Sequence, residues 1–152
     1  MSTLPRAPKI ALVVTVAVLV VAVTTAWCLQ VRAEREDVAQ RYVIVVERAE
    51  DALCVLSLDE LQALESRRVV MQGQRQEGPP LLSVLESCGV VEFESVEVFG
   101  MGVRDDGYIR LGREEIDEDV LLDFAIRGTT KLCGPDIPWE RRVRDVERIV
   151  VR

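Results

Sequence analysis

Histidine is absent from this chain of 152 residues, and its absence excludes several kinds of chemistry. Imidazole is the usual side chain that gains or loses a proton near neutral pH, and it is a common ligand of zinc and iron. Ser-His-Asp hydrolysis, Cys-His thiol catalysis, histidine-ligated metal centres and histidine pH switches are therefore all excluded.

Closely spaced cysteines are missing as well. The four cysteines are Cys28, Cys54, Cys88 and Cys133, so no CxxC or comparable ligand spacing occurs, and we expect no zinc or iron-sulfur site. Residues typical of a core flank Cys54 and Cys88, which favours buried free thiols at both positions. If the domain is exported, one disulfide among Cys54, Cys88 and Cys133 is the alternative, and the sequence does not choose the pair.

A phosphate-binding loop and a basic cluster are the remaining absences. The glycines match neither a GxGxxG fingerprint nor a P-loop. Residues 33–152 carry 16 basic and 26 acidic side chains, a net charge of −10, so nucleic acid is not an expected partner. The arginines of residues 141–148 are interleaved with acids, which predicts a solvated mixed-charge face. Contact of these C-terminal arginines with an anionic cofactor would require the basic residues to be segregated from the acids.

One long apolar run is present. Residues 10–31 contain 18 apolar residues in 22 and no charged one. At about 1.5 Å per residue, a helix of about 20 residues spans the roughly 30 Å hydrocarbon core of a membrane, and Trp27 suits the membrane-water interface. The expected organisation is a basic head (1–9), a transmembrane helix in the lipid bilayer (10–31), a juxtamembrane linker (32–41) and a domain (42–152).

The N-terminal region allows two alternatives. A cleaved signal peptide is the first, because Arg6 and Lys9 form a basic head and residues 24–26 are small enough for a cleavage site. The second concerns orientation, because four arginines follow the span and would place the domain in the cytoplasm by the positive-inside rule. A short basic head followed by an apolar run is typical of export, and we favour a single-pass protein of the cell membrane with an extracytoplasmic domain.

Hydrophobic patterns in residues 42–152 predict an α+β domain that is largely β, with two short helices. One helix is predicted over residues 57–64, where Ser57 and Glu60 have capping-box spacing, and the other between Pro80 and Gly89. Strands are predicted at residues 42–46, buried on both faces, and at 68–72, 93–99, 108–111 and 120–126. Residues 73–78 are predicted to form a turn or hairpin link, and residues 143–150 match a helix and a strand equally well.

Two acidic groups could carry chemistry. Residues 114–119 suggest a calcium site, but they lack the acid spacing and the glycine of an EF-hand loop, which favours a solvated turn. Asp105 and Asp106 could act as paired carboxylates in acid-base catalysis, but their position before Gly107 favours turn capping.

Several short motifs occur in an order that resembles one family. They lie at residues 56–64, 78–90, 106–108, 120–124, 134–135 and 142–149. Together they resemble the oxidoreductase molybdopterin-binding domain of the sulfite oxidase superfamily, in its small stand-alone bacterial form. The resemblance covers about residues 40–152 and implies a mixed α+β fold of largely β character, with a strand at the C-terminus.

The catalytic residues of that family do not carry over. Its catalytic members hold molybdenum through a cysteine thiolate just after the strand that follows the first helix, and residues 68–73 contain no cysteine here. A soft metal without its thiolate loses its anchor, and the histidines that usually hold the pterin phosphate are missing too. We therefore expect no catalytic residue, no metal ligand and no bound cofactor, and we assign no cofactor-binding residue.

The resulting hypothesis is a membrane-anchored, non-catalytic binding or accessory module, for which a membrane protein is one candidate partner. A divergent molybdopterin-dependent oxidoreductase that uses Cys133 or an oxygen ligand is an alternative. Another is a structural membrane protein whose acidic face binds a basic partner. A space between residues 73–78 and 134–135 that is filled by side chains favours the binding module.

Overall fold

The computed structural model describes residues 7–71, 73–101 and 107–152, and it divides the chain into two compact units with a boundary between Asp37 and Val38. Helix α1 (Ala7–Arg41) supplies the described part of the first unit, so residues 32–41, predicted as a linker, continue the apolar helix. Within α1, Thr15–Glu34 is long and apolar enough to cross a membrane, and none of it is buried. Such a segment serves as a membrane anchor or as a signal sequence.

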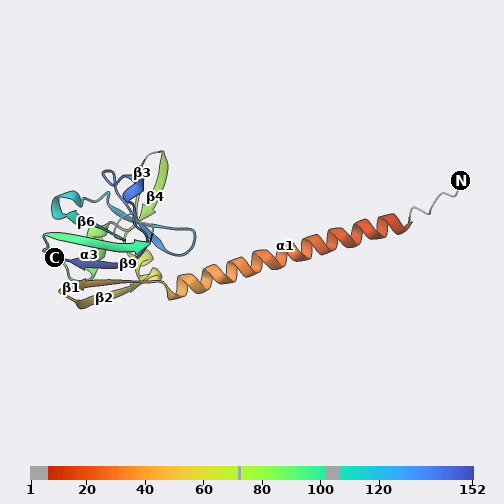
Figure 1. Ribbon diagram of the computed structural model, residues 1–152, viewed down its shortest axis with the longest axis horizontal. Helices are drawn as coiled ribbons and strands as arrows, with labels where there is room; N and C mark the ends of the chain where they lie inside the picture. Colours follow the sequence, from red (N-terminus) through yellow and green to blue (C-terminus); the bar gives the residue numbers. More distant parts are fainter. Residues whose placement is uncertain (1–6, 72, 102–106) are drawn as a thin grey trace. The chain divides into compact units, whose positions relative to one another are not determined.

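The second unit is the predicted α+β domain, and it is built on a seven-stranded sheet (Figure 1). Its main path runs in the order β2 (Asp51–Ser57), β1 (Val43–Arg48), β9 (Arg144–Val151), β5 (Ser95–Met101) and β6 (Tyr108–Gly112). Strand β8 (Thr130–Cys133) pairs with β9 and with β7 (Leu121–Phe124). The β1–β9 pair is parallel, and the other pairs among the described strands are antiparallel.

A separate hairpin and two helices complete the domain. Strands β3 (Arg67–Met71) and β4 (Gln74–Gly78) form a two-stranded antiparallel sheet. Helix α2 (Leu58–Ala63) begins with the predicted capping box, in which the Ser57 amide donates to Glu60 Oε2 (2.7 Å) and the Glu60 amide donates to Ser57 Oγ (3.3 Å). Two 3₁₀ turns, η1 (Arg113–Glu115) and η2 (Trp139–Arg141), lie later in the chain.

Helix α3 (Leu81–Ser87) ends as its sequence predicts. Gly89 has a left-handed φ of +78°, its amide donates to the Glu86 carbonyl (2.9 Å), and the Val90 amide donates to the Leu85 carbonyl (3.0 Å). These two hydrogen bonds form a Schellman motif, which favours glycine at this position. The motif ends the helix and returns the chain toward β5.

A single hydrophobic core joins the helices to one face of the large sheet. Its fully buried members include Leu81, Val84 and Leu85 of α3 and Ile44 and Val46 of β1. Residues 42–46 were predicted to be buried on both faces, which is wrong, because Val43 is 41% exposed. Strand β1 therefore alternates between a covered and an open face.

The bounds of several other strands differ from the prediction, because they depend on pairing with neighbouring strands. Residues 73–78, predicted as a link, contain strand β4 beyond a turn at Gly73, where φ is +75°. The predicted strand 120–126 stops at Phe124, and the chain turns through Gly128 into β8. The ambiguous C-terminal segment is strand β9, held between β1 and β5. Residues 105 and 106 of the predicted turn lie outside the described residues, and Gly107, which follows them, has a φ of +73°.

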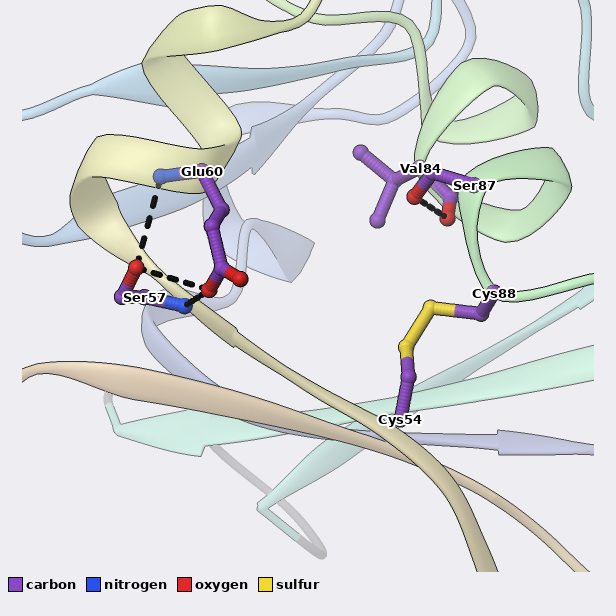
Figure 2. The surroundings of a disulfide bond; sticks show 6 residues. All are labelled: Cys54, Ser57, Glu60, Val84, Ser87 and Cys88. Atoms are coloured by element: carbon purple, nitrogen blue, oxygen red, sulfur yellow. Dashed lines mark hydrogen bonds between the residues drawn. A yellow bond between two sulfur atoms is a disulfide. The ribbon is translucent and has the colours of Figure 1, made fainter.

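The cysteines differ from the favoured prediction. Cys54 on β2 and Cys88 at the end of α3 form a disulfide with a Cα–Cα separation of 5.5 Å (Figure 2). The expectation of free thiols at these two positions is therefore wrong, and the alternative of one disulfide holds. Cys133 is a buried free thiol.

Candidate functional site

A cleft of about 720 Å³ opens on the domain beside the β3–β4 hairpin. Three segments line it: the start of β4, the β7–β8 hairpin with its turn, and the residues around the start of β9. The lining residues are Gln74, Arg75, Asp123, Phe124, Ala125, Ile126, Arg127, Lys131, Arg142, Arg144 and Asp145. The single Lys131–Arg144 pair between β8 and β9 brings the last two segments together.

The charge of the cleft is opposite to that of the domain. Its lining contains five basic side chains and two acidic ones, whereas residues 33–152 carry a net charge of −10. Basic residues that are spread over 70 positions of the sequence thus meet at one place. A concave site of one sign concentrates ions of the opposite sign, so this cleft favours an anion.

Both acidic side chains of the cleft have hydrogen-bond or ion-pair partners within the protein. Asp123 pairs with Lys131 (2.9 Å) through Oδ2 and accepts a hydrogen bond from the Glu77 amide (2.6 Å) through Oδ1. Asp145 Oδ1 accepts a hydrogen bond from the Thr129 hydroxyl (2.6 Å). Asp123 therefore offsets the charge of Lys131, Asp145 keeps its charge while it accepts from Thr129, and the lining retains an excess of three basic groups.

Arg142 is the most unusual member of the set. Its Nε and Nη2 atoms are buried, and neither has a hydrogen-bond partner among the residues that the structure describes. A buried guanidinium N–H without an acceptor costs free energy, and a carboxylate, sulfate or phosphate oxygen is the acceptor that best relieves that cost. Arg142 therefore has two N–H donors that lack an acceptor in the described part of the chain, and the residue itself lines the cleft.

The backbone at the start of β9 is also unusual. The β5–β9 register shifts between Phe99 and Met101, and Asp145 adopts a left-handed φ of +47°. At Gly100 an added Cβ atom would lie 2.5 Å from the Arg144 carbonyl oxygen, so only glycine fits there. Bulges and strained residues are common beside functional sites, and here they shape the wall that carries Arg144 and Asp145.

The region between β4 and the segment at Gly134 is filled. Gln76 is 1% exposed and Cys133 is 0% exposed, and the Cys133 thiol donates to Gln76 Oε1 (3.5 Å). Burial raises the pKa of the Cys133 thiol to about 11, so the sulfur stays protonated at neutral pH. A buried protonated thiol is a poor metal ligand.

The molybdenum centre of the resembling family does not fit the residues present. Residues 68–73 contain no cysteine, and the sulfurs of Cys54 and Cys88 are bonded to each other. No group of three or more histidine, cysteine or acidic side chains within the described ranges could hold a metal ion. The cleft lining is dominated by N–H donors, and its two carboxylates have protein partners, so it suits an anion better than a metal.

The acidic residues of the segment 114–119 lie outside the cleft, and several of them have structural partners. Arg67 forms ion pairs with Glu118 and with Asp119 (3.2 Å), and Glu115 accepts a hydrogen bond from the Gly112 amide (2.7 Å). The solvated-turn interpretation of residues 114–119 agrees with these contacts.

Sequence reasoning missed most of the cleft. The C-terminal arginines were considered as a group for contact with an anion if their charges were segregated from the acids, and the structure brings two of them, Arg142 and Arg144, to the cleft. Arg75, Arg127 and Lys131 give no local signal, because only the pairing of β8 with β9 and the position of the β3–β4 hairpin bring them close.

Comparisons with known proteins bear on the fold. No protein-family model matches the chain, and no curated protein matches it. A crystal structure of the sulfane dehydrogenase SoxCD from Paracoccus pantotrophus is similar, with a TM-score of 0.60 and 16% identity, over 74% of this chain and 38% of that chain. The chain thus corresponds to well under half of the length of SoxCD, and the likeness supports a sulfite oxidase-like fold, in agreement with the resemblance seen in the sequence.

Proposed function

We propose that this protein is a membrane-anchored, non-catalytic accessory module that uses a sulfite oxidase-like fold to bind a small anionic ligand. The observation that carries the proposal is Arg142, whose Nε and Nη2 atoms are buried without an acceptor among the described residues and which lies in a cleft lined by five basic side chains. The likeness to an oxidoreductase fits an oxidoreductase-derived module.

The size and charge of the cleft limit the ligand class. A volume of about 720 Å³ lies within the range of small-molecule sites. Planar guanidinium groups bind carboxylate, sulfate and phosphate through paired hydrogen bonds. A small organic phosphate or sulfate, including a metal-free pterin phosphate, belongs to this class.

The absence of a suitable thiolate supports a non-catalytic role. Cys133 is the one free thiol of the domain, and its burial keeps it protonated. A divergent enzyme that uses Cys133 as a metal ligand would have to expose and deprotonate it, against a pKa of about 11.

The ligand proposal is tested on the full chain purified in detergent. Calorimetric titration with inorganic phosphate and with sulfate should show binding that weakens with salt, and Arg142→Met should weaken it by at least tenfold. Neighbouring Arg141, which is exposed, provides the matched control Arg141→Met. Equal loss in both variants, or no binding of either anion, would contradict the proposal. Stoichiometric molybdenum in the purified protein would favour the divergent enzyme instead.

The location is part of the same proposal. Disulfides persist in oxidising compartments, so the Cys54–Cys88 bond supports an extracytoplasmic domain despite the four arginines after the apolar segment. Val70 is 70% exposed, and Val70→Cys in intact cells should react with a membrane-impermeant maleimide. Labelling only after permeabilisation would place the domain in the cytoplasm. The intact mass of the mature protein separates an anchor from a cleaved signal peptide.

A further inference from the structure

The large sheet ends on one side at an edge strand with little protection. Strand β2 pairs with β1 alone among the described strands, which leaves its outer row of backbone N–H and C=O groups available. Residues 52–57 contain neither a charge nor a proline. Sheet edges in soluble proteins are usually blocked by lysine, proline or a covering segment, because a free edge pairs with other strands.

The side chains at this edge are apolar and exposed. Val55 is 52% exposed and Leu53 is 41% exposed. Val55 lies opposite Val45 on the open face of the sheet, and Val43, on the same face of β1, is 41% exposed. The opposite edge differs, because β6 carries Arg110 at its centre, paired with Glu97 (2.8 Å).

The disulfide holds the edge strand in place from the inside. Figure 2 shows Cys54 directed from β2 toward Cys88 at the end of α3. Val55 follows Cys54 on the same strand, so its side chain lies on the opposite face of the sheet. The register with β1 shifts between Val46 and Glu47, where Leu53 has no partner on β1, and Cys54–Ser57 stay in continuous register beyond the shift. A strand that is already ordered loses less conformational entropy when another strand binds to it.

Acidic residues flank the apolar stretch at both ends. Exposed Glu50 and Asp51 precede it, and exposed Asp59 and Glu60 follow it. Two copies of β2 side by side would bring these acids together, in domains (residues 42–152) that each carry a net charge of −9, so self-pairing is opposed by repulsion. An incoming strand with basic ends has the complementary charge.

We propose that β2 is a docking edge for an extended segment of a partner protein, with an apolar centre flanked by lysine or arginine. The segment adds to the sheet as a further strand, so that its main chain bonds to the outer edge of β2 and its apolar side chains cover Val55 and Val43. Its basic ends lie beside Glu50–Asp51 and Asp59–Glu60. This edge lies on a different element from the basic cleft, so the two sites are independent.

The test uses the full chain in detergent and two synthetic peptides, KKTVTVTKK and the acid-flanked EETVTVTEE. The basic peptide should bind at least tenfold more tightly, and its binding should slow amide hydrogen exchange in residues 52–57. Val55→Lys should reduce its affinity at least tenfold. Val70→Lys changes a valine that is 70% exposed on the separate β3–β4 sheet, and it should leave the affinity within twofold.

Three results would overturn the proposal. Equal affinity for both peptides would show that the acids flanking β2 do not select a basic partner. Amide exchange that slows elsewhere but not in β2 would show that the peptide binds at another place. A dimer of the full chain that Val55→Lys dissociates would show that a second copy occupies β2. Because Val55 is largely exposed, Val55→Lys should keep the circular dichroism of the native protein, and Leu53→Lys provides a second edge variant if it does not.

Discussion

At the scale of single residues, Arg142 is expected to bind the anion and, without it, to destabilise the folded protein. A buried polar group without a partner costs about 1–3 kcal/mol. We therefore expect Arg142→Met to raise the free energy of unfolding of the ligand-free protein by roughly 1 kcal/mol while it weakens anion binding. Urea unfolding with and without phosphate measures both effects. A variant that is less stable than the native protein without ligand would show that the guanidinium has a structural partner.

Glu97 makes the stability of the domain depend on pH. Its side chain is 8% exposed, and it pairs with Arg152 (3.0 Å) and with Arg110 (2.8 Å). The hydrogen bond from Arg152, followed by the charges of Arg152 and Arg110, lowers the pKa of Glu97 below its ordinary value of 4.5. A lowered pKa in the folded state stabilises the protein above about pH 4.5, and this stabilisation is lost as the pH falls through the folded-state value.

The corresponding variant is Glu97→Gln. At pH 7 it should be less stable by roughly 2 kcal/mol, the usual contribution of hydrogen bonds to a charged group, and the difference should shrink as the pH falls below 4.5. Unfolding free energies from pH 7 to pH 3 measure the trend. Exposed Glu92→Gln is the control and should differ little from the native protein at any pH in this range. A constant difference for Glu97→Gln would mean that the ion pairs do not contribute.

At the scale of elements, the disulfide joins β2 to α3 across a separation of 34 residues. Closing a loop of this length in the unfolded chain corresponds to about 4 kcal/mol on the chain-entropy model. We expect Cys54→Ser with Cys88→Ser to lose about this amount, as measured by urea unfolding. Cys28→Ser leaves the disulfide intact and should leave the stability of the domain unchanged. A loss below 1 kcal/mol in the double variant would show that packing alone orders β2.

The elements also show which structure the sequence could predict. Helices α2 and α3 were predicted because their signals are local: a capping box at Ser57, and an early proline with a late glycine around α3. Strand β4 was missed because its sequence, QRQEG, is polar, and Gln76 is buried only through its position against Cys133. Strands of this kind form because of contacts with neighbouring strands that are distant in the sequence, so a local sequence pattern does not predict them.

At the scale of the whole molecule, the fold class could be predicted and the site could not. The order of short motifs was enough to anticipate a sulfite oxidase-like fold, and the missing cysteine was enough to question the metal. The basic cleft depends on the segregation of charges that alternate along the chain. Arg142 and Arg144 lie among acids in the sequence. The fold brings them together with Arg75, Arg127 and Lys131 in one cleft.

That segregation has a kinetic consequence. An approaching anion is first repelled by a domain with a net charge of −9 (residues 42–152) and is attracted by the arginines only at close range. Salt at 0.1 M screens charges beyond about 10 Å, so it weakens the distant repulsion more than the contact attraction. Stopped-flow measurements should therefore find that added salt leaves the association rate of phosphate unchanged or higher and raises its dissociation rate. An association rate that falls steeply with salt would indicate that the cleft dominates the outer field. With the expected salt dependence, the acidic surface lowers the association rate of every anion alike. The dissociation rate, which depends on how well each anion binds Arg142, then determines which anion stays bound.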